Sequence, residues 1–181
     1  MRPDGASRRA IEVVPHDPAW ASLFREEERK LRALFGGALL VIHHIGSTAV
    51  PGLAAKPIVD MLGVARDIGV ADGRNGAMAR LGYRAMGEYG IPGRRFFIRE
   101  VQGGRTHHLH VFGDRHPRIR DHLGFRDHLL GHPEEAQAYG RLKQELARRF
   151  PHDIEAYMAG KDPFIRGILR RIAPARPGNP L

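Results

Sequence analysis

The sequence predicts an α+β (mixed α/β) domain, because strands come first and helices last. Four apolar runs of strand length occupy the first two thirds of the chain, at about 39–45, 57–64, 94–101 and 105–112. Helical periodicity runs through the last third, from about residue 115 to residue 172. A length of 181 residues fits one domain, which we place at residues 10–172, with loose tails at 1–9 and 173–181.

Spacing and turn residues predict the remaining elements. A short strand is expected at 11–14, followed by a helix from about Pro18 to Phe35 with Asp17 as its N-cap. A helix at about 70–81 and a weak strand at 83–87 follow. The helical third divides into separate helices at about 115–130, 133–149, 152–160 and 162–172.

The two later strand runs predict a hairpin around Gly103-Gly104, since glycine suits the positive φ of a tight turn. Pairing Gln102 with Arg105 gives a core face that carries Phe96, Ile98, Leu109 and Val111, with Glu100 opposite His107. The other face then carries Arg95, Phe97, Arg99, His108, His110 and Phe112. Arginine suits phosphate oxygens, and paired histidines suit a metal or a phosphate. The alternative is an ordinary polar sheet face.

Composition narrows the class of protein. The chain has no cysteine, which excludes disulfides and thiolate zinc sites. It shows neither an apolar stretch of membrane-spanning length nor a signal-peptide core, so we expect a cytoplasmic protein with no membrane partner. A net charge of +9 favours polyanionic partners such as nucleotides or RNA, although a merely solvated basic surface explains the charge as well.

The most informative segment runs from His43 to Asp60. A buried strand ends in a Gly46-Ser47-Thr48 turn, whose free backbone N–H groups would cradle phosphate oxygens. Lys56 then leads into a second strand that carries Asp60, an acid placed to hold a divalent cation against that phosphate. The segment therefore predicts a metal–nucleotide site.

These residues also carry a resemblance to a known family. The chain resembles the GrpB family over about residues 11–172, through His44-Ile45-Gly46-Ser47-Thr48, Val50-Pro51-Gly52-Leu53, Lys56-Pro57-Ile58-Val59-Asp60 and His108-Leu109-His110-Val111. The resemblance implies a fold similar to the nucleotidyltransferase superfamily: a mixed sheet with flanking helices and a helical C-terminal third. That superfamily places two acids at alternate positions of one strand. Here Asp60 matches the first and Leu62 occupies the second, so two-metal catalysis is in doubt.

The resulting expectation is a metal-dependent, nucleotidyltransferase-like protein that binds a nucleotide or another phosphorylated small molecule. The alternative is a non-catalytic nucleotide- or RNA-binding module with a degenerate site. A third option is a metallohydrolase built on a single transition metal. Asp60 is the candidate catalytic residue. The candidate phosphate ligands are Gly46, Ser47, Thr48, Lys56, Arg95, Arg99, Lys143 and Lys161.

The expected cofactor is Mg²⁺ or Mn²⁺, with zinc as the alternative if imidazoles bind the metal. The candidate metal ligands are Asp60, His108 and His110. Two of the lysines follow a tyrosine by four residues, as Tyr139/Lys143 and Tyr157/Lys161, and each pair shares one helical face. Such lysines would either reach phosphates or extend along the protein surface to water.

Overall fold

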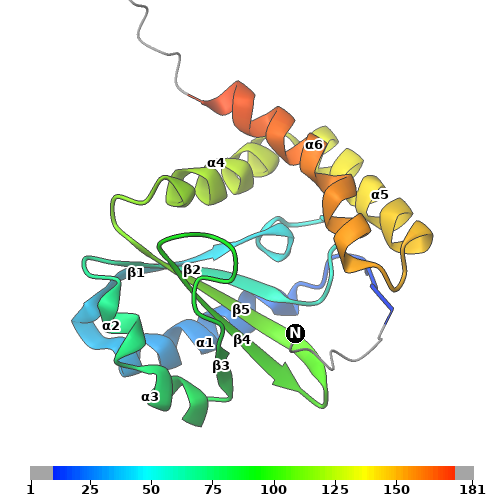
Figure 1. Cartoon of the computed structure of the whole chain (residues 1–181). Coiled ribbons are helices and arrows are strands. Elements are labelled where there is room, and N and C mark those ends of the chain that lie inside the picture. Colours follow the sequence, from blue (N-terminus) through cyan, green and yellow to red (C-terminus); the bar gives the residue numbers. More distant parts are fainter. Residues whose placement is uncertain (1–9, 174–181) are drawn as a thin grey trace, which may run out of the picture.

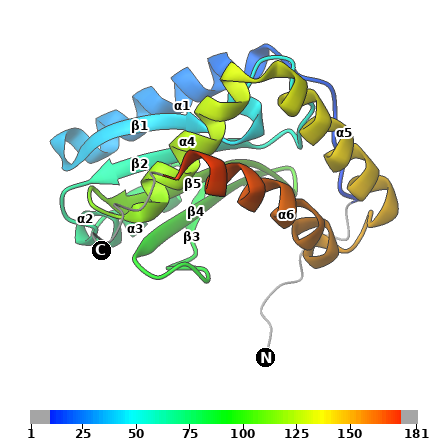
Figure 2. The same cartoon turned by 90° about the horizontal axis from the view of Figure 1, so that it is seen from above.

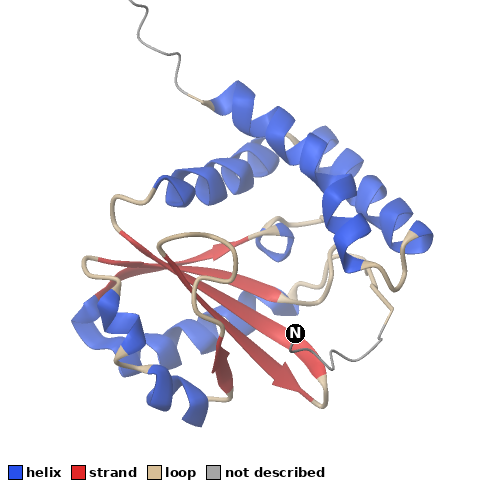
Figure 3. Ribbon diagram, viewed as in Figure 1, coloured by secondary structure: helices blue, strands red, loops and turns tan. Residues whose placement is uncertain are grey.

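The computed structural model describes residues 10–173 and contains a mixed five-stranded sheet (Figures 1 and 3). The strands lie in the order β1-β2-β5-β4-β3, and β2 and β5 pair in parallel while the other pairs are antiparallel. Their bounds are β1 Leu39–Ile45, β2 Val59–Ala65, β3 Tyr83–Ala85, β4 Arg94–Val101 and β5 Gly104–Gly113. The predicted α+β class is confirmed. The predicted tails at 1–9 and 173–181 lie outside the described residues, apart from residue 173.

Helices cover both faces of the sheet (Figures 1 and 2). One face carries α1 (Ala19–Phe35), α2 (Gly69–Asp72) and α3 (Asn75–Arg80). The other face carries α4 (Pro117–Gly131), α5 (Pro133–Arg149) and α6 (Ile154–Ile172), which form the predicted helical C-terminal third. Short 3₁₀ turns, η1 (Gly36–Ala38) and η2 (Ser47–Ala49), flank β1. None of the helices within residues 10–173 has the length and apolar character needed to cross a bilayer.

The two faces of the sheet bury different clusters. Beneath α1 and α3 lies the largest core, where Phe97, Leu109 and Val111 of the hairpin meet Leu31 and Phe35 of α1. On the opposite face a smaller cluster under α4 holds the buried side chains Ile45, Leu62 and Phe112. A third cluster joins α4, α5 and α6 to the loop after η2. The α4–α6 face of the sheet carries the smaller of these two clusters, and the candidate site lies there.

Some predicted element boundaries were wrong. The expected helix at 70–81 is interrupted at Gly73 and Arg74, so it forms the separate α2 and α3. The expected helices at 152–160 and 162–172 are one helix, α6, which continues through Pro163. Proline removes one helical N–H, but buried residues on both sides of it keep the helix packed. The expected strand at 11–14 is reduced to an isolated bridge between Val14 and Ala55.

The predicted register of the hairpin was wrong by two residues next to the turn and by one residue along the rest of β4. Val101 pairs with Gly104, and the turn consists of Gln102 (φ 50°) and Gly103 (φ 74°). A bulge after Arg99 then shifts the pairing by one residue, so that Arg99 pairs with His107 and Ile98 with His108. A shift of one residue exchanges the faces of one strand relative to the other. The strand β4 therefore presents its even-numbered residues, not Arg95 and Arg99, on the face that carries the site histidines.

Candidate functional site

The turn after β1 depends on Gly46. Its backbone adopts φ 70° and ψ −169°, a region that is essentially restricted to glycine. A Cβ atom added to Gly46 would lie 2.9 Å from Oδ2 of Asp60. Glycine therefore allows the turn to close against the carboxylate of the neighbouring strand. The backbone of the predicted phosphate-binding turn and the predicted metal ligand are in direct contact.

A buried hydrogen-bond chain holds the other end of this turn. The hydroxyl of Thr48 donates to the carbonyl oxygen of Ile58 at 3.4 Å, and His44 Nε2 donates to Thr48 Oγ1 at 2.9 Å. Burial lowers the pKa of His44 to about 4, so its ring is neutral at physiological pH. The side chain of Thr48 is thus used inside the protein. In the structure it supports the turn, while Thr48 also lines the cavity, so its role as a phosphate ligand stays a prediction.

Asp60 lies at the centre of three adjacent strands. It pairs with Ile45 of β1 and with His108 of β5. Its Oδ1 atom is 2.9 Å from His108 Nδ1 and 3.9 Å from His110 Nε2. Burial raises the pKa of Asp60, but the two histidines outweigh that effect and hold the pKa of this carboxyl well below its usual range. Asp60 is therefore a carboxylate throughout the physiological pH range.

Hydrogen-bond partners assign the tautomers of both histidines. His108 Nδ1 faces a carboxylate and must donate, while its buried Nε2 has no hydrogen-bond partner among the described residues. Arg94 Nη1 lies 3.2 Å from His110 Nδ1, and an arginine only donates, so Nδ1 of His110 is the acceptor. The proton of neutral His110 is then on Nε2, which faces Asp60. Burial lowers the pKa of His110, in agreement with a neutral ring.

Three lysines face the same space from the loop before β2 and from α5 and α6. Lys143 Nζ donates to Ser47 Oγ at 2.7 Å and also to the carbonyl oxygen of Ala54. Lys161 Nζ lies 4.7 Å from the centroid of the Tyr157 ring, and Lys56 Nζ lies 5.5 Å from it. The predicted i, i+4 pairs thus bring their lysines into the site.

The lysines are held in an unfavourable electrostatic environment. Burial, together with the charge of Lys161, lowers the pKa of Lys143 to about 7. Burial and the charge of Lys56 lower the pKa of Lys161 to about 8. Burial also lowers the pKa of Lys56. A bound polyanion would compensate these charges, so the cluster has the electrostatic character of an anion site.

The structure separates the predicted arginines from the site. Arg95 lies on the α1–α3 face and binds Asp72, with Nε 2.6 Å from Oδ1. Arg99 binds the buried Glu27 on that same face, at 3.0 Å. Sequence reasoning missed Arg94, a buried arginine of β4 that holds the carbonyl oxygens of Glu88 and Tyr89 as well as His110. With the correct register, its alternation with Phe96 would have placed it in the site.

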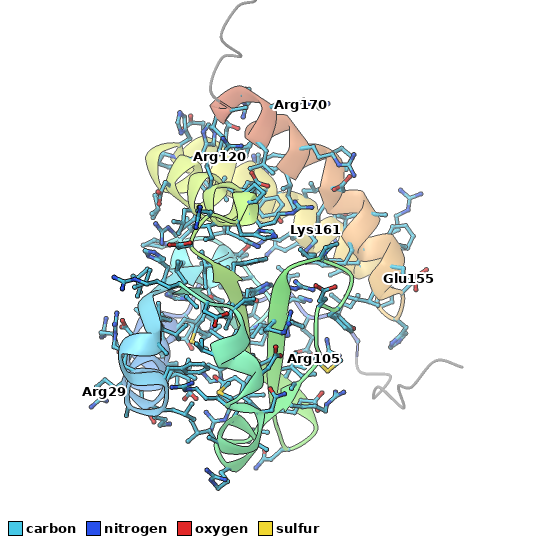
Figure 4. All side chains as sticks on the ribbon, turned by 60° about the vertical axis from the view of Figure 1, so that its left-hand side comes forward. Arg29, Arg105, Arg120, Glu155, Lys161 and Arg170 are labelled. Atoms are coloured by element: carbon cyan, nitrogen blue, oxygen red, sulfur yellow. The ribbon has the colours of Figure 1, made fainter. Side chains whose placement is uncertain are left out.

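These side chains line one cavity of about 540 Å³, within the usual range for small-ligand sites. Its lining holds five basic and two acidic residues, which are Lys56, Arg94, Arg105, Lys143 and Lys161 against Asp60 and Glu155. In Figure 4, Lys161 extends from α6 toward the strands and Arg105 lies on the hairpin, whereas Arg29 is far away on α1. Tyr89, Phe96 and Tyr157 add aromatic surface. The cavity is suited to a ligand with an anionic part and a planar part.

The donor atoms fit a cation shared with phosphate better than a metal held by protein alone. The predicted ligands Asp60, His108 and His110 are close together, but their ligand atoms do not form a set of three within 4.8 Å of one another. Leu62, at the second-acid position, is fully buried and packs against Ile45 and Phe112. Asp60 is thus left as the carboxylate beside the turn. One carboxylate completed by substrate oxygens is a normal Mg²⁺ arrangement.

A scan against family models matches residues 10–171 of the chain to the GrpB protein model. The chain belongs to the GrpB family. The protein YqkA of Bacillus subtilis is 43% identical over 161 residues, which cover 88% of this chain and 46% of that protein. The chain thus spans about half the length of this relative. The crystal structure of GrpB from Enterococcus faecalis matches with a TM-score of 0.84 and 40% identity, covering 88% of this chain and 96% of that one.

More distant structures share the fold of the GrpB chain. The Cid1 poly(U) polymerase in its MgGTP-bound form matches with a TM-score of 0.51 and 11% identity, covering 76% of this chain and 44% of that one. At such low identity the likeness shows the fold alone. The predicted mixed sheet with flanking helices and a helical C-terminal third is confirmed, and Cid1 shares this fold.

Proposed function

We propose that this GrpB-family chain binds a nucleotide, or another phosphorylated small molecule, in the cavity together with one divalent cation, Mg²⁺ or Mn²⁺. The observation that carries the proposal is that the metal-binding candidate, the turn and the lysines all lie around one cavity. A carboxylate that stays ionised, Asp60, adjoins a glycine turn and shares the cavity lining with two buried lysines, Lys143 and Lys161, and the partly buried Lys56. An anion and its counter-cation need that combination of charges.

The proposal gives each group a role. Ser47, the backbone at Gly46, and the ammonium groups of Lys143 and Lys161 would contact phosphate oxygens, while Asp60 would hold the cation against them. A bound cation would neutralise phosphate charge. His108 and His110 would fix the direction of the Asp60 carboxylate through their donated protons, as outer-shell groups do in metal sites.

The Cid1 structures support the choice of ligand. Cid1 structures hold MgGTP or the short product ApU and concern selectivity for UTP, in a chain that shares this fold. Nucleoside triphosphates are therefore the first ligands to test. A single carboxylate beside the turn makes transfer chemistry a separate question from binding, and an assay of labelled-nucleotide transfer addresses it once binding is found.

The test is thermal stability of the wild type and of Asp60→Asn with each nucleoside triphosphate, with and without Mg²⁺ or Mn²⁺. A ligand that binds only the folded state stabilises it by about 2.7 kcal/mol at a hundredfold excess over its Kd. We expect a metal-dependent rise in Tm that Asp60→Asn loses. Asp72→Asn, on the opposite face, makes the same charge change and should keep the rise. No rise with any nucleotide, or an equal rise in Asp60→Asn, would contradict the proposal.

A second candidate function is RNA binding by a site that has lost catalysis. Two observations favour it: the buried Leu62 at the second-acid position and the net charge of +9. RNA affinity should fall steeply with added salt, because binding releases counterions from the phosphates. A fluorescence titration of a short single-stranded RNA at two salt concentrations measures this. A flat salt response would exclude this mode of binding.

A further inference from the structure

A second group of metal-ligating side chains lies where α4 meets α5, outside the cavity. His128 is in the last turn of α4, His132 caps the helix end, and Glu135 is in the first turn of α5. Their ligand atoms all lie within 4.8 Å of one another, and within the described residues this is the one such set of three. Figure 2 shows α4 passing directly into α5 at this corner of the helical layer.

A hydrogen bond fixes the tautomer of neutral His132 as one that can bind a metal. Its Nδ1 atom is 2.7 Å from the carbonyl oxygen of His128, and because a carbonyl only accepts, Nδ1 carries the proton. In the neutral ring, Nε2 then keeps its lone pair. Metal-bound histidines commonly donate their other ring N–H to a carbonyl in this way.

One oxygen of the Glu135 carboxylate is bound by an arginine of α6. Arg171 of α6 binds its Oε2 atom, which leaves Oε1 directed at His128 Nε2, 3.1 Å away. Two atoms bound to one tetrahedral zinc at 2.0–2.1 Å lie about 3.3 Å apart, so this spacing needs little change to receive a metal. The rings of His128 and His132 are stacked, with centroids 3.9 Å apart and an interplanar angle of 13°, so one ring must turn for both lone pairs to meet at one metal.

We propose that His128, His132 and Glu135 form a binding site for a divalent transition metal, with Zn²⁺ as the best match to two imidazoles and one carboxylate. The metal would replace the His128–Glu135 hydrogen bond. It would also join the end of α4 to the start of α5 and, through Arg171, to α6. The site is independent of the nucleotide proposal, because none of its three ligands lines the cavity.

The experiment is isothermal titration of Zn²⁺ into untagged, chelator-stripped protein. All variants are made in an Asp60→Asn background, so that the cavity carboxylate cannot contribute. His132→Ala removes an exposed ligand, and Glu135→Gln keeps the shape of the third ligand while removing its charge. The matched control is His152→Ala, which removes an exposed histidine that is not part of the cluster. Visible absorption of bound Co²⁺ gives a second readout of the coordination.

We expect the background protein to bind one Zn²⁺ per chain. Each ligand variant should lower the affinity by more than about tenfold, the smallest effect typical of losing even an outer-shell partner. The Co²⁺ spectrum should disappear in both. The control should bind as the background does. Absence of Zn²⁺ binding in the background, or equal affinities for His132→Ala, Glu135→Gln and His152→Ala, would overturn the proposal.

Discussion

Replacing Lys161 by Met should stabilise the free protein near neutral pH and weaken its hold on phosphate. Burial and the charge of Lys56 lower the pKa of Lys161 from 10.5 to about 8. At pH 6.5 the group is charged in both the folded and the unfolded state, and this shift corresponds to roughly 3 kcal/mol in favour of unfolding. Loss of the cation–π contact with Tyr157 removes about 1 kcal/mol of stabilisation. The net gain in the free energy of unfolding is then about 2 kcal/mol, or about 1 M in the urea midpoint at a typical slope.

The same reasoning fixes the pH dependence. Lys161 has a folded pKa below its unfolded pKa, so its destabilising effect is complete below the folded value and shrinks as pH rises from about 8 toward 10.5. At pH 9.5 the gain from Lys161→Met should be smaller by roughly 2 kcal/mol. Urea unfolding at pH 6.5 and 9.5 measures both effects. Lys30→Met is the matched control, because Glu26 raises the pKa of Lys30, and it should bring no gain. A less stable Lys161→Met protein at pH 6.5, or an equal gain at both pH values, would refute the reasoning.

Three further predictions test the turn, the register and the lysine cluster. Gly46→Ala should lower the free energy of unfolding, measured in urea, by about 2–4 kcal/mol through backbone strain and the contact with the Asp60 carboxylate. Gly52→Ala, at φ 76° with open space around it, should lower it by less. Equal losses would contradict the reasoning. Arg99→Met should destabilise by about 1–3 kcal/mol, because the buried Glu27 loses its closer cationic partner and keeps only Lys30, at 3.3 Å. It should leave nucleotide binding intact, whereas Arg94→Met should weaken binding in a fluorescence titration. The opposite pattern would favour the register predicted from the sequence. Triphosphate affinity should fall between pH 7 and 9, because Lys143 and Lys161, with pKa values of about 7 and 8, must take up protons on binding. Calorimetry in buffers of different ionisation heat would detect that proton uptake. Its absence would count against contacts between these lysines and phosphate.

Local sequence signals were sufficient for part of the site. The turn at Gly46 and the carboxylate at Asp60 lie within one continuous segment, so glycine conformation and strand alternation could place them together. Lys143 and Lys161 were found because each follows a tyrosine by one helical turn. In these cases the residues that determine the geometry are neighbours in the chain.

The rest depended on pairing that local signals do not determine. Gly103-Gly104 suggested that both glycines form the turn, but the turn consists of Gln102 and Gly103, which moves the pairing by two residues. The bulge after Arg99 moves it back by one, so the net change along most of β4 is one residue. That shift removed Arg95 and Arg99 from the site and brought in Arg94. The observed register buries Phe97 against α1, and the sequence of the hairpin alone does not indicate this tertiary contact.

The parallel pairing of β2 with β5 has a consequence for how the protein matures. Asp60 and His108 are 48 residues apart, and Ser47 and Lys143 are 96 residues apart. Closing such long loops costs chain entropy and slows folding, because this cost comes before the resulting contacts stabilise the structure. A nascent or partly folded chain with its hairpin formed would still lack the cavity. A ligand of the cavity would therefore bind only chains that have folded completely. A ligand present during folding would stabilise those chains and no partly folded ones.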